Sequence, residues 1–155
     1  LNAADNLDGG LELGDSVYAA EKLSKEGIDA IEVSAGTPAS GIKNPARQRI
    51  NKPEKEAYHL EQARRIKAGV TCPVMVVGGF RSFEVAEGAI KNHGMDYIAM
   101  SRPLIREPDL PNRWLRGERR PAKCISCNSC FKPGLEEGGI YCVVEKKERE
   151  KVAKG

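Results

Sequence analysis

Three segments of the chain repeat one pattern, in which an amphipathic stretch ends at a glycine and a short apolar run follows it. The apolar run at residues 31–33 follows Gly27, the run at 74–77 follows Gly69, and the run at 97–100 follows Gly94. Before each glycine the apolar residues recur at three- and four-residue spacing, which predicts a helix. We expect each glycine to end its helix in a left-handed conformation, and Ser82 to be the N-cap of the third helix.

Continuous apolar runs that alternate with helices indicate parallel strands covered by helices, so we predict an α/β fold. A closed barrel of eight such units takes about 250 residues, whereas this chain has 155 residues and three complete strands. We therefore predict a partial TIM (β/α)8 barrel, about half of one, over residues 1–118. Residues 1–5 are interpreted as the end of an earlier strand, so the chain is expected to begin part-way through that barrel.

Two of the strand ends carry residues that suit a phosphate. Gly78 and Gly79 follow the second strand, and Ser101 and Arg102 follow the third. The carboxyl ends of parallel strands meet at one edge of the sheet, so we expect these residues to lie close together. Backbone amides exposed by glycines, together with one guanidinium, can bind a phosphate dianion. The sequence therefore predicts a phosphate site at the mouth of the barrel.

The remaining polar candidates are interpreted as structural. Residues 35–45 form a long loop with several glycines and prolines after the first strand, and we expect this loop on the substrate side of the site. Arg47, Gln48 and Arg49 follow the loop; they could reach a substrate or NAD(P)H, but we interpret them as part of a solvated charged loop. His59 is predicted inside a helix and His93 next to a helix end, both without a chemical role. Trp114 is predicted to anchor the last helix in the core.

Four cysteines follow the predicted barrel with the spacing Cys124-x2-Cys127-x2-Cys130-x11-Cys142. Thiolates at such spacing bind iron–sulfur clusters or tetrahedral zinc. We predict a small Cys-rich lobe over residues 119–145, with these four cysteines as metal ligands, followed by a charged tail over 146–155. Free thiols without a metal are the third alternative. Cys72 precedes a strand and is interpreted as a packing residue.

Composition argues against nucleic-acid and membrane partners. The 25 basic and 22 acidic residues are intermixed, and aromatic residues make up 5% of the chain, whereas nucleic-acid-binding proteins typically combine a basic stripe with stacking aromatics. No apolar run approaches the roughly 20 residues that span a bilayer. The first residues do not resemble a secretory signal, so we expect a cytoplasmic location.

Four motifs carry a resemblance that covers nearly the whole chain. They are Asn2-Ala3-Ala4-Asp5 with Gly9-Gly10, residues 31–36, residues 73–79, and residues 100–105 followed by Pro108-Asp109-Leu110. In this order and spacing they resemble the NADH:flavin oxidoreductases of the Old Yellow Enzyme family. The resemblance is to the branch related to 2,4-dienoyl-CoA reductase and trimethylamine dehydrogenase.

This resemblance implies an FMN-dependent TIM barrel. The chain would correspond to its C-terminal half, beginning at the end of the fifth strand. By matching motif, Gly78, Gly79, Ser101 and Arg102 would bind the FMN phosphate. Phe80 would pack against the dimethylbenzene edge of the flavin or lie buried beneath the loop. The implied activity is reduction of activated alkenes or related small-molecule acceptors by NAD(P)H, as in enoate reductases. The family's catalytic residues lie mostly upstream of this chain, so the catalytic residues are unknown and the chain is expected to be inactive alone.

The relatives related to 2,4-dienoyl-CoA reductase also carry cysteines beginning Cys-x2-Cys-Asn that bind [4Fe–4S], and Cys124 to Asn128 resembles that opening. The third cysteine departs from the pattern. Three residues separate the second and third cysteines in the relatives, whereas two residues separate Cys127 from Cys130 here. Zinc at the same cysteines is the alternative. The alternative function is a zinc-binding half-barrel that docks a partner without flavin chemistry. Open sheet edges also favour a homo-oligomer.

Overall fold

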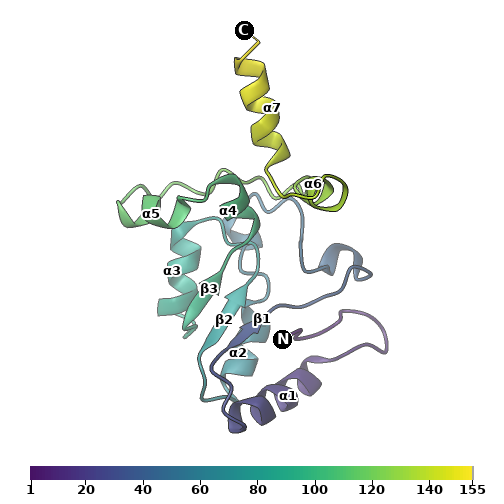
Figure 1. Cartoon of the computed structure of the whole chain (residues 1–155). Helices are drawn as coiled ribbons and strands as arrows, with labels where there is room; N and C mark the ends of the chain where they lie inside the picture. Colours follow the sequence, from purple (N-terminus) through teal and green to yellow (C-terminus); the bar gives the residue numbers. More distant parts are fainter. Residues whose placement is uncertain (155) are drawn as a thin grey trace.

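The computed structural model describes residues 1–154 and contains one parallel three-stranded sheet (Figure 1). Its strands are β1 (Ile31–Val33), β2 (Val74–Val77) and β3 (Tyr97–Ala99), in that spatial order. Val76 pairs with Val33 on one side and with Ile98 on the other. The three predicted strands, their parallel direction and the α/β class are confirmed. This open parallel sheet is consistent with the predicted partial TIM barrel.

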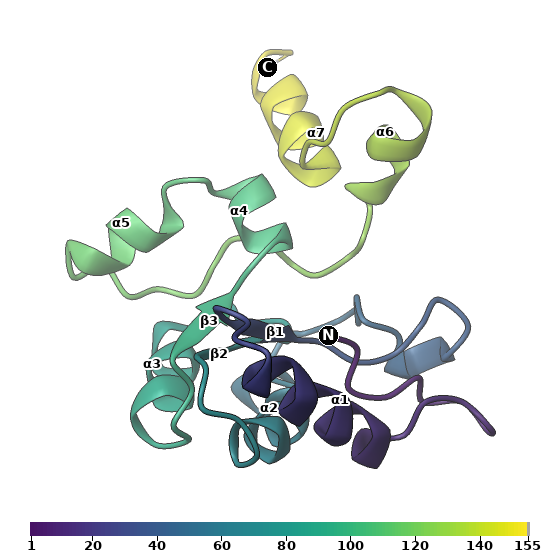
Figure 2. The ribbon, with the colours of Figure 1, turned by 60° about the horizontal axis from the view of Figure 1, so that its bottom comes forward.

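Three helices cover one face of the sheet, as Figure 2 shows. They are α1 (Leu13–Lys25), α2 (Leu60–Lys67) and α3 (Phe83–Lys91). Gly27 and Gly94 adopt the predicted positive φ angles, +89° and +70°. Gly69 is not among the glycines with positive φ; a Cβ atom there would lie 2.9 Å from Oε1 of Glu21 on α1. The predicted left-handed cap at Gly69 is therefore wrong, and the nearest atoms to this position belong to the flexible Glu21 side chain.

The core lies between the sheet and these helices. Val33, Val74 and Val76 are fully buried, and the helices present mainly alanines to them. The buried residues of these three helices are Ser16, Ala20, Ala63, Ile66, Ala86 and Ala89. Small side chains on the helices let the helix axes approach the sheet closely, while the β-branched strand residues fill the space between.

The first residues of the chain extend the sheet beyond β1. Asn2 forms an isolated parallel bridge with Ser34. The Ala3 amide donates to the Ser34 carbonyl at 2.7 Å, and the Ser34 amide donates to the Leu1 carbonyl at 3.1 Å. The strand-like pairing predicted for residues 1–5 is confirmed.

Four further helices follow β3 and lie beyond the carboxyl edge of the sheet (Figures 1 and 2). They are α4 (Arg102–Arg106), α5 (Leu110–Leu115), α6 (Phe131–Glu136) and α7 (Val143–Val152). Two short 3-10 turns, η1 (Gly41–Lys43) and η2 (Pro53–Lys55), lie in the connection between β1 and α2. Trp114 is buried as expected, but it belongs to α5 and two helices follow it.

Much of the predicted charged tail is helical. Residues 146–152 belong to α7, which projects away from the sheet in Figure 1. Glu148 on α7 accepts a hydrogen bond from Arg106 at 2.5 Å, and this ion pair ties the helix to α4. Gly155, the last residue of the predicted tail, lies outside the described residues. The boundaries at residues 118 and 145 stay a prediction.

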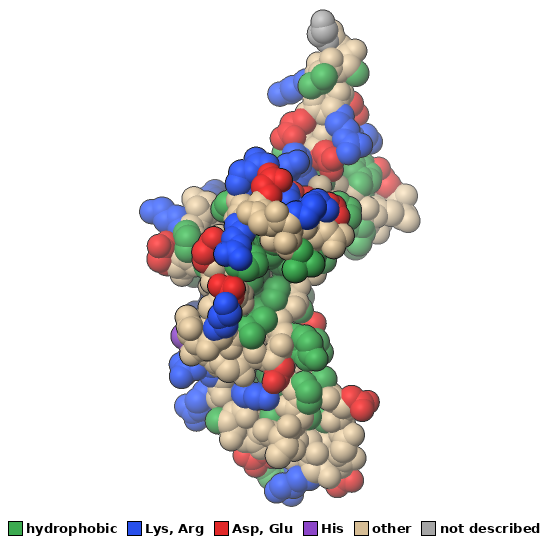
Figure 3. Space-filling view, turned by 90° about the vertical axis from the view of Figure 1, so that its left-hand side faces the viewer, with side chains coloured by type: hydrophobic (Ala, Val, Ile, Leu, Met, Phe, Trp, Pro, Cys, Tyr) green, Lys and Arg blue, Asp and Glu red, His purple; other side chains and the backbone are tan. Residues whose placement is uncertain are grey.

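The β3 side of the sheet is open. Tyr97 on β3 is 57% exposed, and a groove of about 550 Å³ lies beside this strand. Its lining residues include Phe83, Ile90, Ile98, Met100, Leu104 and Trp114. Figure 3 shows hydrophobic side chains gathered on this side of the molecule. Within residues 1–154, no helix has the length and apolar character needed to cross a membrane.

Candidate functional site

The two strand ends predicted to bind phosphate line one small cavity. β2 and β3 are neighbours in the sheet, and Gly79, Phe80, Ser101 and Arg102 all contribute to the cavity wall. Gly78 is buried directly beside them and does not line the cavity itself. The volume is about 110 Å³. Since a water takes about 30 Å³ in the liquid, the cavity suits a group of a few heavy atoms rather than a whole flavin.

The two glycines permit a close contact with the segment that precedes α2. Gly79 has a φ of +71°, and a Cβ atom there would lie 2.6 Å from Cε1 of Tyr58. A Cβ atom on Gly78 would lie 3.0 Å from the Tyr58 amide nitrogen, which donates to the Gly78 carbonyl at 3.1 Å. The glycines thus serve a packing purpose that the sequence alone did not indicate.

Arg102 is a buried cation without a carboxylate partner. It is 8% exposed, and its Nη1 atom donates to the Arg47 carbonyl at 2.9 Å and to Oδ1 of Asn128. Among the described residues, Arg102 takes part in no salt bridge, and its Nε and Nη2 atoms donate no hydrogen bond. Arg113 is equally buried and differs, because Glu107 neutralises it at 2.6 Å. A buried guanidinium with free donors is suited to bind an anion.

Arg47 lies beside the same cavity, and the prediction that it is a solvated charge is wrong. Its guanidinium carbon lies 4.5 Å from the centroid of the Tyr58 ring, and its Nε atom is buried without a hydrogen-bond partner. Tyr58 lines the cavity and donates through its hydroxyl group to the Pro45 carbonyl at 2.9 Å. The aromatic ring holds the arginine in place through a cation–π contact. No sequence motif marked either residue.

His59 is fully buried next to this cluster. It is the N-cap residue of α2 rather than a residue inside the helix, because the backbone of Tyr58 and His59 packs against Gly78 before the helix begins. Both ring nitrogens lack hydrogen-bond partners. Burial, and secondarily the charge of Arg47, lowers the pKa of His59 to about 4. The imidazole is therefore neutral near pH 7 and adds no charge to the site.

The chain after the cavity is held by a buried carboxylate. Glu56 accepts hydrogen bonds from the amides of Arg81 at 2.7 Å and Ser82 at 2.9 Å, and from the Ser82 hydroxyl at 2.6 Å. Ser82 occupies the predicted N-cap position, but its hydroxyl is used by Glu56 and does not cap the helix. Phe80 is 1% exposed and packs in the core cluster. This geometry favours the buried-aromatic interpretation of Phe80.

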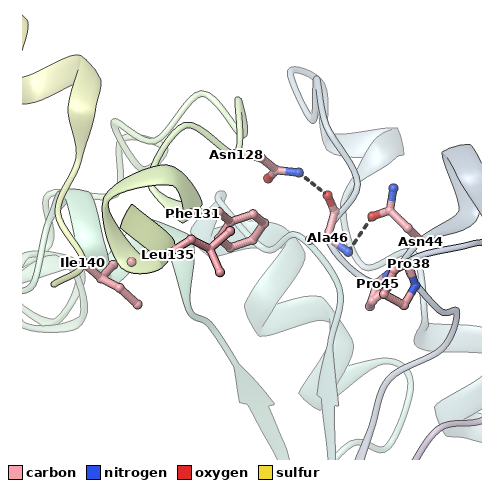
Figure 4. Close-up of a pocket in the computed structure, with 9 residues that line it drawn as sticks. Pro38, Asn44, Pro45, Ala46, Asn128, Phe131, Leu135 and Ile140 are labelled. Carbon is pink, nitrogen blue, oxygen red and sulfur yellow. Dashed lines mark hydrogen bonds between the residues drawn. The ribbon is translucent and has the colours of Figure 1, made fainter. Parts of the chain in front are cut away.

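A larger apolar groove adjoins the small cavity (Figure 4). Its volume is about 750 Å³, within the roughly 300–1,000 Å³ range of small-molecule sites. One wall comes from the long loop after β1, through Pro38, Pro45 and Ala46, and the other from α6 and its flanks. Pro45, Ala46 and Phe131 line both spaces. A planar apolar group could therefore extend from an anion held by Arg102 into this groove.

The cysteines are only partly gathered. Burial raises the pKa of the Cys130 thiol, and the charges of Cys124 and Cys127 raise it further. The Cys142 sulfur instead accepts a weak hydrogen bond from Arg106 at 3.6 Å. In residues 1–154, no group of three or more Cys, His, Asp or Glu side chains is arranged to bind a metal ion. The predicted four-cysteine metal site stays a prediction.

Comparison with known proteins finds similarity to one family of oxidoreductases. A family model described as NADH:flavin oxidoreductase / NADH oxidase family matches residues 1–120. An NADH oxidase from Thermoanaerobacter brockii is 32% identical over 83% of this chain and 19% of its own length. A bilirubin reductase from Clostridium symbiosum is 30% identical over 61% of this chain and 26% of its own length. The chain thus spans about a fifth to a quarter of these relatives.

A solved structure is similar over most of the chain. It is a complex of 2-naphthoyl-CoA reductase with 2-naphthoyl-CoA, with a TM-score of 0.65 and 26% sequence identity. The similarity covers 84% of this chain and 19% of that protein. The residues matched by the family model include the whole sheet and all lining residues of the small cavity except Phe131.

Proposed function

The chain belongs to the NADH:flavin oxidoreductase / NADH oxidase family, and from this premise we propose that it carries the phosphate-binding part of an FMN-dependent oxidoreductase. The family membership confirms the prediction made from the motifs. The single observation that supports the site is the buried Arg102 side chain, which has no carboxylate partner among the described residues and lines a small cavity together with Gly79. A phosphate dianion would supply the missing negative charge.

The residues present fit the phosphate end of FMN. Arg102 would bind the phosphate oxygens, Gly79 and Ser101 would contribute the wall that approaches them, and Arg47 would add positive potential. The apolar groove beside Pro45 and Phe131 would exclude water from the ring. When bound, FMN supplies hydride transfer, and this chain contributes binding and orientation.

The whole protein would reduce a small-molecule acceptor with NAD(P)H. The reductases among its relatives, named for bilirubin and 2-naphthoyl-CoA, support an unsaturated organic acceptor. Because the chain spans about a fifth to a quarter of these relatives, the groups that deliver protons to the acceptor are proposed to lie on other segments of the whole protein. A homo-oligomer through the open β3 side stays a prediction.

The test is binding of FMN and of riboflavin, which lacks the phosphate, to the purified protein. Arg102→Gln should weaken FMN binding about 30- to 100-fold, because a charge-assisted hydrogen-bonded contact is worth about 2–3 kcal/mol. Riboflavin affinity should not change. The control is Arg116→Gln, an exposed arginine paired with Asp109 on α5, which should bind both ligands as the parent does. Failure of the parent to prefer FMN over riboflavin would refute the proposal.

Metal binding by the cysteine loop is the second candidate function, and the spacing Cys124-x2-Cys127-x2-Cys130 favours it. The Cys142 sulfur accepts a hydrogen bond from Arg106, so among the described residues the four thiols do not form a complete ligand set. No electron-transfer step is assigned to them. Iron, acid-labile sulfide and zinc should be measured in anaerobically purified protein. Iron with sulfide would support a cluster, whereas one zinc per chain without FMN binding would support the interaction module.

A further inference from the structure

The loop from Cys124 to Cys130 reaches across the structure and contacts the anion site directly. The Asn128 side chain donates through Nδ2 to the Ala46 carbonyl at 2.7 Å, as Figure 4 shows. Its Oδ1 atom accepts a hydrogen bond from Nη1 of Arg102, which also donates to the Arg47 carbonyl at 2.9 Å. One amide side chain therefore links the cysteine loop, the loop after β1, and the arginine after β3.

The backbone of the cysteine loop is shaped for this contact. Asn128 has a φ of +63° and Ser126 a φ of +54°. Asparagine tolerates the left-handed conformation better than most residues, which suits position 128. The Ser126 carbonyl accepts a hydrogen bond from the Arg49 amide at 3.2 Å, so the loop is held at a second point. The loop therefore has one contact with the rest of the chain that does not involve the Asn128 side chain.

The contact leaves one side of Arg102 available. Nη1 is used by Asn128 and by the Arg47 carbonyl, whereas Nε and Nη2 donate to no described residue. The guanidinium is a rigid planar fork, so fixing one nitrogen sets the direction of the other donors. Arg102 lines the small cavity together with Gly79 and Ser101. Immobilising the arginine before the ligand arrives lowers the entropy cost of binding.

A neutral amide is the chemically appropriate partner. An aspartate at position 128 would keep an acceptor for Arg102 but would neutralise its charge and compete with a phosphate. It would also lose the hydrogen bond to the Ala46 carbonyl, because an ionised carboxylate has no donor. Asn128 orients the guanidinium while leaving its positive charge uncompensated.

We infer that Asn128 is a positioning residue for the anion site: the cysteine loop, through this one side chain, holds Arg102 in the orientation that binds the phosphate of FMN. The inference rests on the proposed function. It assigns to the cysteine loop a role that requires no metal.

The test compares FMN and riboflavin affinities of the folded protein for two variants and a matched control. Asn128→Gly relaxes the backbone and removes the side chain, and it should weaken FMN binding about tenfold, the factor for one lost hydrogen bond to a charged group of about 1.4 kcal/mol. Asn128→Asp should weaken it further, by about 30-fold or more, because the carboxylate repels the phosphate. Riboflavin affinity should stay at the parent value in both.

Ser126→Gly is the control, because Ser126 shares the loop and the left-handed conformation and its hydroxyl forms no hydrogen bond with the described residues. It should leave the ratio of FMN to riboflavin affinity unchanged. Equal losses of FMN and riboflavin affinity in Asn128→Gly would mean general destabilisation and would overturn the inference. An FMN affinity equal to that of the parent protein would also overturn it. If Asn128→Gly does not fold, Asn128→Asp alone decides. A parent protein without preference for FMN would overturn the proposed function as well.

Discussion

Replacing His59 with phenylalanine should remove most of the acid sensitivity of the fold between about pH 7 and pH 5. His59 is fully buried and neither ring nitrogen has a hydrogen-bond partner. Its ring meets Tyr58 edge-on at a centroid distance of 4.5 Å, which a phenyl ring can reproduce. Because no hydrogen bond is lost, the substitution separates the titration of the imidazole from its packing.

The direction follows from the lowered pKa. The pKa of His59 falls from 6.5 to about 4 on folding, so between these values the unfolded chain binds a proton that the folded chain does not. Above pH 6.5 His59 contributes no pH dependence, and stability is lost as the pH falls toward 4. The shift corresponds to about 3 kcal/mol in full, of which about 2 kcal/mol is lost between about pH 7 and pH 5.

The assay is the free energy of unfolding in urea at both pH values, followed by circular dichroism, for the parent, His59→Phe and His93→Gln. The chain has only two histidines, and His93 is exposed, so His93→Gln controls for histidine content. The parent and His93→Gln should lose about 2 kcal/mol, and His59→Phe much less. Equal losses in all three proteins, or an imidazole NMR titration centred near the ordinary histidine pKa, would refute the burial argument.

Two further substitutions test the packing around the site. Gly79→Ala should destabilise the protein by about 1–3 kcal/mol and lower its melting temperature, because the residue has positive φ and its Cβ would meet the Tyr58 ring at 2.6 Å. An unchanged melting temperature would contradict that contact. Glu107→Gln should cost about 3 kcal/mol in urea unfolding, because it breaks the buried pair with Arg113. Glu118→Gln, in an exposed pair, should cost less than about 1 kcal/mol, and comparable losses would contradict the burial argument.

The parts of the fold that were predicted from sequence are those set by local periodicity. Alternating helices and apolar runs predicted all three strands, because a buried parallel strand needs a continuous apolar run and its covering helix needs an apolar stripe. Gly27 and Gly94 were correctly predicted as left-handed, whereas Gly69 was not. Glycine is compatible with both signs of φ, so the residue type alone could not distinguish Gly69 from the two left-handed positions.

The site was predicted only where its residues follow strands. Gly79 and Arg102 lie at adjacent strand ends, and the order of strands along the chain was enough to bring them together. Arg47 and Asn128 come from loops 55 and 26 residues from Arg102, and their contacts depend on loop conformation. Such contacts leave no periodic signal, and a charged loop residue is indistinguishable in sequence from a solvated one. The missed residues are therefore the ones that complete the anion site.

The two most buried arginines differ in how their charge is compensated, and this difference favours a binding role for Arg102. Carbonyl partners alone are not specific to it, because the half-buried Arg81 donates to the Ile50 and Ala122 carbonyls and has no carboxylate partner among the described residues. Arg113, in contrast, is buried and is neutralised by Glu107. Arg102 is buried to the same extent, yet its partners are a carbonyl oxygen and an amide oxygen. These neutral groups accept hydrogen bonds from Nη1 but do not neutralise the positive charge of the guanidinium. An uncompensated buried charge costs stability. An anion bound to Arg102 would offset this cost. We therefore predict that FMN raises the melting temperature more than riboflavin, which has no phosphate.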